Sequence, residues 1–271
     1  MQRSSEPRMT DRSVTKENLD KIYAEAFDVE AFKSVDPCGV VYKLIDHIEL
    51  NPAVQSSQLD IELGALFVAM ISWGNRKAIC PAAERMLGDE MHWRPAEFVM
   101  SGAFEESYKT AKNNCVYRTL NVDTFKKVCR KLQQALQGYS SMEELFAGKS
   151  TKDVVATICS WLSDAKVGTM DKSACKRVCM FVRWMTRHSA PDFHVWKSRS
   201  QSDLYAVMDV HVCELTASLL KNKRPAWKTC EELTGIFRLW NPDDPLKYDV
   251  ALMVLSDRID KENKETPMIN N

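Results

Sequence analysis

Apolar residues recur every three or four positions along most of this chain, the spacing that places them on one face of an α-helix. The least polar segment runs from Leu59 to Trp73 and has almost no polar face, so we expect a buried central helix there. Gly74 directly after it marks the end of that helix. By the same criterion, further helices are expected over residues 16–30, 40–49, 76–87, 95–100, 104–109, 122–137, 153–164, 173–188, 209–220, 227–240 and 245–256, with a short one after Ser141.

Glycine is scarce, at 9 of 271 residues, and no Asn-Gly or Asp-Gly pair separates alternating apolar strands. Tight hairpins depend on such pairs, so the pattern predicts an all-α fold. The chain has no internal repeat and no low-complexity linker, which favours a single domain over residues 16–258. The polar stretches 1–15 and 259–271 are expected to be a disordered start and a frayed end.

No apolar run reaches the roughly 18 residues of a membrane-spanning helix, and the N-terminus lacks the apolar core of a secretory signal. The 9 cysteines are scattered, odd in number, and include no Cys-x-x-Cys pair. This usage is typical of free thiols in a reducing compartment, so we expect a cytoplasmic protein.

Charge is balanced over the whole chain, with 37 basic and 37 acidic side chains, and this balance argues against a nucleic-acid-binding protein. The distribution along the chain is uneven, however. Residues 109–131 and residues 172–199 each hold seven Lys or Arg side chains against one Asp. Two such patches could hold a phosphate backbone, although a solvated helix face is the simpler explanation of either one.

The helix expected over residues 173–188 carries a lysine near its start. One face is apolar, and another face is a ridge made of Lys176, Met180, Arg183 and Arg187. Burial or a neighbouring cation lowers the pKa of a lysine and makes it a nucleophile, and Arg177 follows Lys176 directly. The alternative is a lysine on an ordinary basic surface.

A lone aspartate, Asp209, stands directly before another apolar helical pattern. As the N-cap of that helix it would accept hydrogen bonds from free amides and remain ionised at neutral pH. A fixed carboxylate can stabilise positive charge on a sugar ring or position a nucleophile, whereas the alternative is a purely structural cap. His211, two residues later, is a weaker candidate for contacting a phosphate.

Lys176 and Asp209, with the segments around them, resemble the active site of the helix-hairpin-helix DNA glycosylases, which include endonuclease III and the 8-oxoguanine DNA glycosylases. Met208–Val212 looks like the turn that carries the aspartate, and Lys176–Phe181 resembles the lysine helix. The separation of 209 − 176 = 33 residues is similar to that in the archaeal 8-oxoguanine glycosylases.

Several stretches also resemble an uncharacterised bacterial family of about this length. They are Trp73–Arg76, Val116–Arg118, Cys175–Arg177, Phe181–Met185, Asp209–Val212, Glu232–Thr234 and Asp244–Asp249.

The glycosylase resemblance implies a two-lobed helical bundle, with the hairpin and active-site helices over about 153–220. It implies a monomer that excises a damaged, oxidised-purine-like base from double-stranded DNA in base-excision repair, with no metal or cofactor. The base is flipped out of the duplex, Lys176 attacks the sugar C1′ to form a Schiff base, and Asp209 stabilises the sugar cation. The base pocket would involve Trp73, Asn75, Arg76 and Trp184. The DNA contacts would come from Gly168, Lys172, Arg177, Arg183, Arg187 and His211.

The sequence departs from the superfamily in ways that leave alternatives open. The hairpin has one glycine, Gly168, where two usually hold a phosphate, and Lys172–Ala174 imitates the lysine motif and competes with Lys176. No cysteine follows Cys230, which excludes the iron–sulfur cluster of endonuclease III. A non-catalytic nucleic-acid-binding or interaction protein on the same fold is the main alternative. A metal-dependent hydrolase is a weaker one, because the 5 histidines form no metal-binding motif. The lesion and the role of Asp249 stay unassigned.

Overall fold

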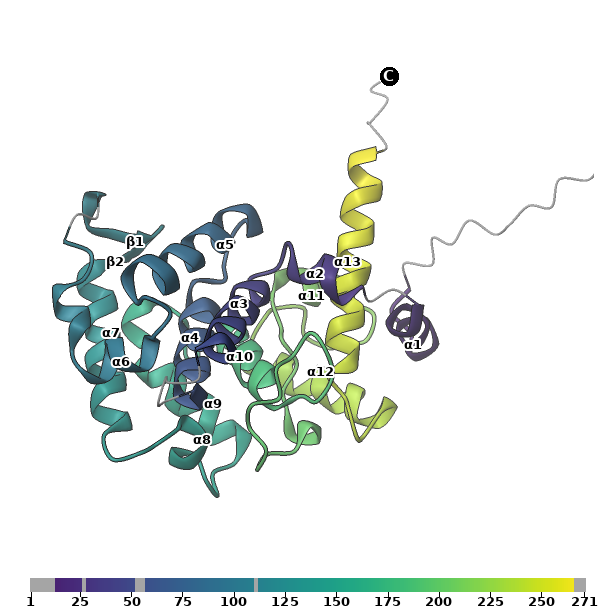
Figure 1. The fold of residues 1–271 in the computed structure, drawn as a ribbon. Helices are drawn as coiled ribbons and strands as arrows, with labels where there is room; N and C mark the ends of the chain where they lie inside the picture. The colour runs from purple at the N-terminus through teal and green to yellow at the C-terminus, as the bar shows by residue number, and fades with distance from the viewer. Residues whose placement is uncertain (1–12, 26–27, 52–56, 110–111, 266–271) are drawn as a thin grey trace, which may run out of the picture.

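A computed structural model describes residues 13–25, 28–51, 57–109 and 112–265 of the chain. Nearly all of its regular structure is helical, so the predicted all-α class is confirmed (Figure 1). The α-helices are α1 (Lys16–Glu25), α2 (Val29–Lys33), α3 (Cys38–Leu50), α4 (Ser57–Ile71), α5 (Arg76–Glu84), α6 (Pro95–Met100), α7 (Val122–Leu136), α8 (Met142–Leu145), α9 (Thr151–Trp161), α10 (Lys176–Thr186), α11 (Val210–Leu215), α12 (Trp227–Trp240) and α13 (Lys247–Glu265).

A short antiparallel hairpin interrupts the helices and is the one element class that the sequence pattern does not predict. Its strands are β1 (Cys115–Tyr117) and β2 (Leu120–Asn121), which form the sole sheet among the described residues. Arg118, in the turn between them, takes the positive φ that glycine often supplies, so no glycine signal marks the turn. Asn121 then caps α7 by accepting a hydrogen bond from the Thr124 amide at 2.8 Å.

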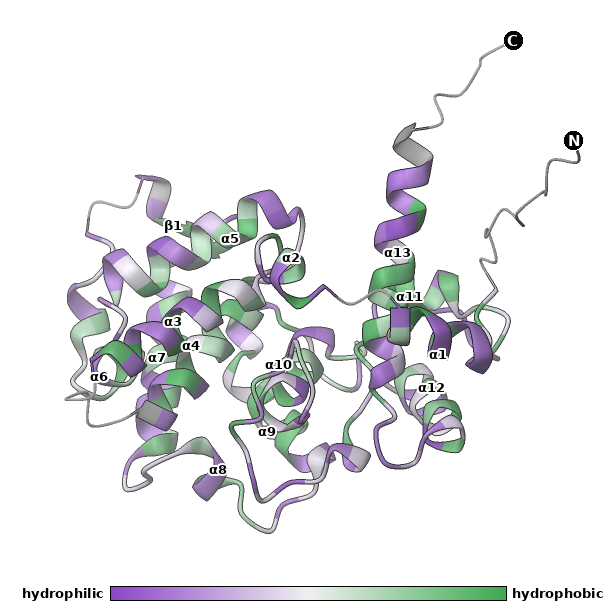
Figure 2. Ribbon diagram, turned by 45° about the vertical axis from the view of Figure 1, so that its right-hand side comes forward, coloured by the Kyte–Doolittle hydropathy of each residue, from purple (hydrophilic) through white to green (hydrophobic). Residues whose placement is uncertain are grey.

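The predicted central helix is confirmed as α4. Its side chains from Leu63 to Ile71 are almost fully buried, and it packs against α3, α6 and α10. Hydrophobic colouring is concentrated on α4 and the inward faces of its neighbours, whereas polar residues cover the outer faces (Figure 2). Because α10 packs directly on α4, the most buried helix fixes the position of the lysine helix.

Helices α11, α12 and α13 of the C-terminal part lie together on one side of the molecule, and the N-terminal helix α1 lies beside them (Figure 1). Helix α13 packs against both α1 and α11. It continues to Glu265, past the helix end expected at residue 256, and its polar distal part projects from the body (Figure 2). Of the two expected disordered ends, residues 1–12 and 266–271 lie outside the described part of the chain.

Several other helix boundaries differ from the sequence expectation: α1 ends at Glu25, and α10 covers only Lys176–Thr186 of the expected range 173–188. Helix α5 continues into a π-helical turn, Arg85–Glu90, which contains Gly88 instead of ending at it. Helix α11 ends at Leu215 rather than near residue 220. Directly after this end, the Thr216 hydroxyl donates to the carbonyl of Val212 at 2.6 Å. None of the described helices is both long enough and apolar enough to cross a membrane.

Candidate functional site

A tight hairpin connects α9 to α10. Gly168 has φ +96°, and the carbonyl of Thr169 accepts hydrogen bonds from the amides of Lys172 (2.9 Å) and Ser173 (2.8 Å). The Ser173 hydroxyl then accepts the Cys175 amide at 3.1 Å. Residues 162–175 therefore join α9 to α10 through the short turn Ser163–Ala165 and the turn at Gly168, and the helix-hairpin-helix motif itself stays a prediction.

Lys176 is the first residue of α10. Cys175 before it has a left-handed backbone, with φ 52°, and supplies no side-chain cap to the helix. The chain therefore turns sharply into α10, and the amides at its start are free of a side-chain acceptor from Cys175.

Asp209 stands at the start of a second helix. An extended buried segment, Leu204–Met208, leads to it, and its carboxylate caps α11 by accepting the Val212 amide at 2.9 Å. The N-cap geometry is the one that the sequence predicts for this residue.

The two helix starts bring Lys176 and Asp209 into contact. Lys176 Nζ donates to Asp209 Oδ2 at 2.6 Å, and the side chains are 39% and 26% exposed. Partial burial works to raise the pKa of the Asp209 carboxyl, but the Lys176 ammonium and the Val212 amide outweigh burial and lower it. The result is an ionised carboxylate held against an amine that solvent and a docked ligand can still reach.

Lys172, the competing lysine, lies elsewhere. It is exposed in the hairpin turn before α10 begins, and only Lys176 of the two forms an ion pair with Asp209. The geometry therefore favours Lys176 as the amine of the candidate site.

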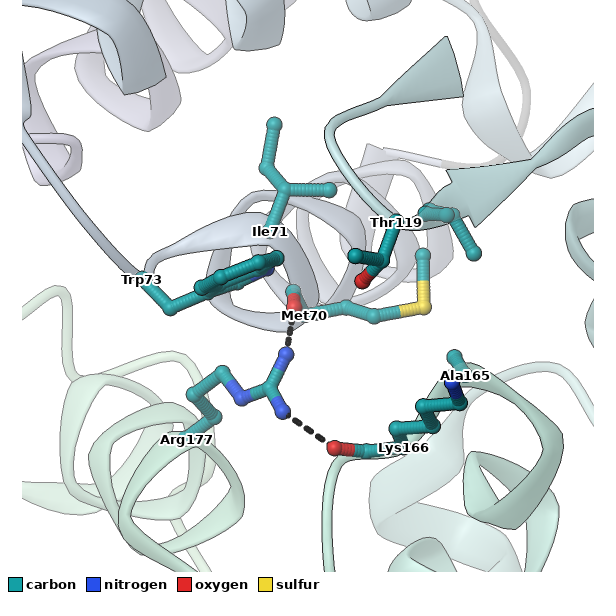
Figure 3. A pocket seen from close by; sticks show the side chains of 8 residues that line it. Met70, Ile71, Trp73, Thr119, Ala165, Lys166 and Arg177 are labelled. Carbon is teal, nitrogen blue, oxygen red and sulfur yellow. Dashed lines mark hydrogen bonds between the residues drawn. The ribbon is translucent and has the colours of Figure 1, made fainter. Parts of the chain in front are cut away.

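A pocket of about 290 Å³ opens beside the first turn of α10 (Figure 3). Arg177 lies at its edge and donates to the carbonyls of Met70 (2.6 Å) and Lys166 (2.7 Å), joining the end of α4 to the hairpin. Burial lowers the pKa of Arg177 to about 10. The lining residues are Met70, Ile71, Trp73, Thr119, Leu120, Ala165, Lys166 and Arg177.

Trp73 is the one predicted base-pocket residue that lines this pocket. Arg118 stacks on its ring at 4.3 Å, and the Tyr117 hydroxyl donates to its carbonyl at 3.0 Å. Sequence reasoning missed Arg118 as a neighbour of Trp73. No local signal could have found it, because the β1–β2 turn and the end of α4 are distant in sequence.

The other three predicted pocket residues do not line it. Asn75 caps α5 by accepting the Lys77 amide at 2.9 Å, and Arg76 bonds to Asp257 at 2.9 Å on α13. Trp184 is 1% exposed and belongs to the hydrophobic core, so its prediction as a base-stacking residue is wrong.

Two predicted phosphate ligands are also wrong. Arg183 and Arg187 are 4% and 0% exposed, so neither can reach DNA. They form a buried ionic cluster with Asp192, which lies 3.1 Å from Arg183 and 3.2 Å from Arg187. Arg187 also makes a two-pronged contact with Asp244 at 2.8 and 2.9 Å.

The remaining predicted DNA contacts stay on the hairpin side or the surface. Gly168 is partly exposed in the hairpin, Arg177 lines the pocket, and Lys172 and His211 are exposed. His211 lies in the first turn of α11, two residues after Asp209. These positions stay predictions, because exposure alone does not identify a phosphate contact.

Three of the seven cations of the first predicted basic patch, residues 109–131, have acidic partners outside that range. Lys109 pairs with Glu106, Arg130 with Glu105, and Lys131 with Asp164. Charge counting within residues 109–131 misses these acids, so the patch is less positive than the sequence indicates.

No group of three or more His, Cys, Asp or Glu side chains could hold a metal ion within the parts of the chain that the structure describes. All cysteines are free thiols, most of them buried.

Comparison with protein families places the chain. The family described as "Protein of unknown function (DUF2400)" matches residues 50–257, so the chain belongs to this family. No curated protein and no solved structure matches the chain significantly. The matched range begins before α4 and ends within α13, and it includes the hairpin, Lys176 and Asp209.

Proposed function

For this member of a family of unknown function, we propose DNA base-excision chemistry: an N-glycosylase with Schiff-base lyase activity on a damaged, oxidised-purine-like base. The observation that carries the proposal is the 2.6 Å contact between Lys176 Nζ and Asp209 Oδ2 at two converging helix starts. It supplies an amine and an ionised carboxylate together, which are the two groups that the glycosylase resemblance requires. The two-lobed helix-hairpin-helix glycosylase fold is part of the same proposal.

The proposed reaction begins with a proton leaving the Lys176 ammonium, which is paired with Asp209 in the resting protein. The departing base accepts that proton, so Asp209 stays ionised. The free amine then attacks the sugar C1′ as the bond to the base nitrogen breaks, and that electron pair leaves with the base. The carboxylate of Asp209 stabilises the positive charge on the sugar in the transition state.

Loss of a proton from the substituted amine and opening of the sugar ring then give a Schiff base between Lys176 and C1′. Elimination of the 3′ phosphate from this intermediate would break the strand, and water would release the lysine. No metal or cofactor takes part in these steps.

The proposed DNA-facing surface combines the hairpin and the starts of α10 and α11. Lys172 in the hairpin turn and His211 in the first turn of α11 are both exposed, and the partly exposed Gly168 hairpin could approach a phosphate. Arg183 and Arg187 have no part in this surface. The pocket beside Arg177 offers the ring of Trp73 as a stacking surface for a nucleobase.

A non-catalytic nucleic-acid-binding protein on the same fold is the second candidate. The specific observation in its favour is that Asp209 already has a structural task, because it caps α11 through Val212. In that protein the Lys176 contact would only join two helix starts.

Borohydride trapping distinguishes the two candidates. The wild-type protein is incubated with duplexes that carry 8-oxoguanine, other oxidised bases or an abasic site, and reduction fixes any Schiff base as a covalent adduct. We expect an adduct that Lys176→Gln abolishes and Lys172→Gln retains, the second variant being the matched control on the same hairpin. No adduct on any duplex, with salt-dependent DNA binding intact, would contradict the enzymatic proposal and favour the binding protein.

A further inference from the structure

The segment that leads to Asp209 is extended and buried but pairs with no strand. Leu204, Ala206 and Met208 are each at most 1% exposed, and the described part of the chain contains no strand beside them. Buried backbone amides and carbonyls need hydrogen-bond partners. The Met208 amide donates to the Ala206 carbonyl at 3.1 Å, and side chains of α12 and α13 supply further partners.

Three residues of α12, spaced four apart, contact this segment from one helix face. Arg238 donates to the carbonyls of Ser202 (3.0 Å) and Leu204 (3.2 Å). One turn earlier, Thr234 Oγ1 accepts the Ala206 amide at 2.9 Å. Cys230, a further turn earlier, donates its thiol to the Ala206 carbonyl at 3.1 Å.

Helix α13 adds the last contact before Asp209. Asp249 Oδ2 accepts the Val207 amide at 2.9 Å, while Asp249 Oδ1 has no hydrogen-bond partner. Arg183 Nη1 lies 3.9 Å from Oδ2. The one hydrogen bond found for the buried Asp249 carboxyl is therefore to the backbone two residues before Asp209.

Keeping the Asp249 carboxylate ionised inside the protein costs free energy, because burial disfavours its charge. Burial raises the pKa of Asp249 to about 6; the nearby Asp192 adds to the rise, whereas Arg183 and Arg187 oppose it. An apolar residue would avoid that cost but would leave the Val207 amide unpaired. The cost of burying Asp249 and its hydrogen bond to the Val207 amide together indicate that Asp249 holds the backbone that leads to Asp209.

We propose that Thr234 and Asp249 are positioning residues, which hold the Ala206–Val207 backbone so that the Asp209 carboxylate meets Lys176. They touch no substrate themselves. The inference gives the otherwise unassigned Asp249 a role, and its value for catalysis rests on the proposed function.

The test reads the Lys176–Asp209 contact directly and needs no DNA. Competitive acetylation with acetic anhydride, followed by peptide mass spectrometry, compares the reactivity of Lys176 with that of exposed Lys172 in the same protein. In the wild type we expect Lys176 to react more slowly, because its ammonium is held by Asp209. Asp209→Ala removes the partner of Lys176 altogether, so it gives the largest increase in the Lys176 acetylation rate that loss of this contact can cause.

We expect Thr234→Val and Asp249→Ala to raise the Lys176 rate about fivefold relative to Lys172, the factor that corresponds to loss of a partly exposed ion pair. Asp249→Asn keeps an oxygen that can accept the Val207 amide and should stay near the wild-type rate. The matched control is Asp60→Ala, since Asp60 is also buried with a pKa raised to about 6 and accepts a backbone amide, that of Ala96 at 2.7 Å.

Unchanged Lys176 reactivity in folded Thr234→Val and Asp249→Ala proteins would overturn the inference. If Asp249→Ala does not fold, Thr234→Val alone decides, because it changes only a hydroxyl to a methyl group. A wild type that fails to trap DNA would refute the proposed function and leave this labelling result unaffected.

Discussion

At the scale of single residues, one ridge of α10 shows what a sequence pattern can and cannot predict. The 3.6-residue period correctly places Lys176, Arg183 and Arg187 on a common face. Their environments differ because different elements pack against successive turns. Lys176 reaches the open side beside Asp209, whereas both arginines are enclosed by acids such as Asp192, which lie outside the helix. The period predicts the face, but only the tertiary packing determines what covers it.

Arg187 is therefore a structural residue, and its replacement should test this directly. Arg187→Met should lower the free energy of unfolding by about 3–5 kcal/mol, because it removes the ion-pair partner of Asp244 and leaves the buried Asp192 with Arg183 alone. Urea denaturation followed by tryptophan fluorescence measures the change. The control is Lys172→Met on the exposed hairpin, which should change stability by about 0.5 kcal/mol or less. Equal, small effects of both substitutions would show that the arginine cluster is not a structural unit.

At the scale of elements, helices with a clear start signal or a strong apolar period could be predicted. The expected bounds of the short α6, which proline begins, and of the long α12 agree with the structure. The β1–β2 hairpin could not be predicted, because its turn uses Arg118 in place of glycine. The pocket beside α10 could not be predicted either, because it depends on contacts between segments distant in sequence.

Two glycines provide a matched test of the hairpin. A Cβ at Gly168 would lie 2.4 Å from the Ser173 hydroxyl, on a backbone with φ +96°, so Gly168→Ala should lower stability by about 1–3 kcal/mol. Gly235 lies within α12 with no atom within 4 Å of its added Cβ. Gly235→Ala should therefore raise stability by about 0.5–1 kcal/mol.

Thermal or urea unfolding of the two variants gives the comparison. A Gly168→Ala protein as stable as the wild type would mean that the hairpin does not need its left-handed glycine. Since Ser173 also accepts the Cys175 amide, we expect a reduced rate of trapping in the same variant.

At the scale of the whole molecule, 37 basic side chains balance 37 acidic ones, and part of this charge is paired internally. Three of the seven cations of residues 109–131 pair with acids, and Arg183 and Arg187 are buried with theirs. Fewer cations are therefore left for a DNA backbone than the two sequence patches indicate. Recognition on this account depends on the site formed by Lys176, Asp209 and the pocket of Trp73, in addition to the non-specific attraction of the remaining cations. Family membership extends from before α4 into α13 and so includes the helices that hold both residues.

The most direct measurement is to identify the residue that bears the trapped sugar. The wild-type protein is reacted with an abasic-site duplex, reduced with borohydride and digested, and the modified peptide is sequenced by mass spectrometry. The account predicts a single modified residue, Lys176, with less adduct in Asp209→Asn. Modification of Lys172 or another amine, or no adduct at all, would contradict it.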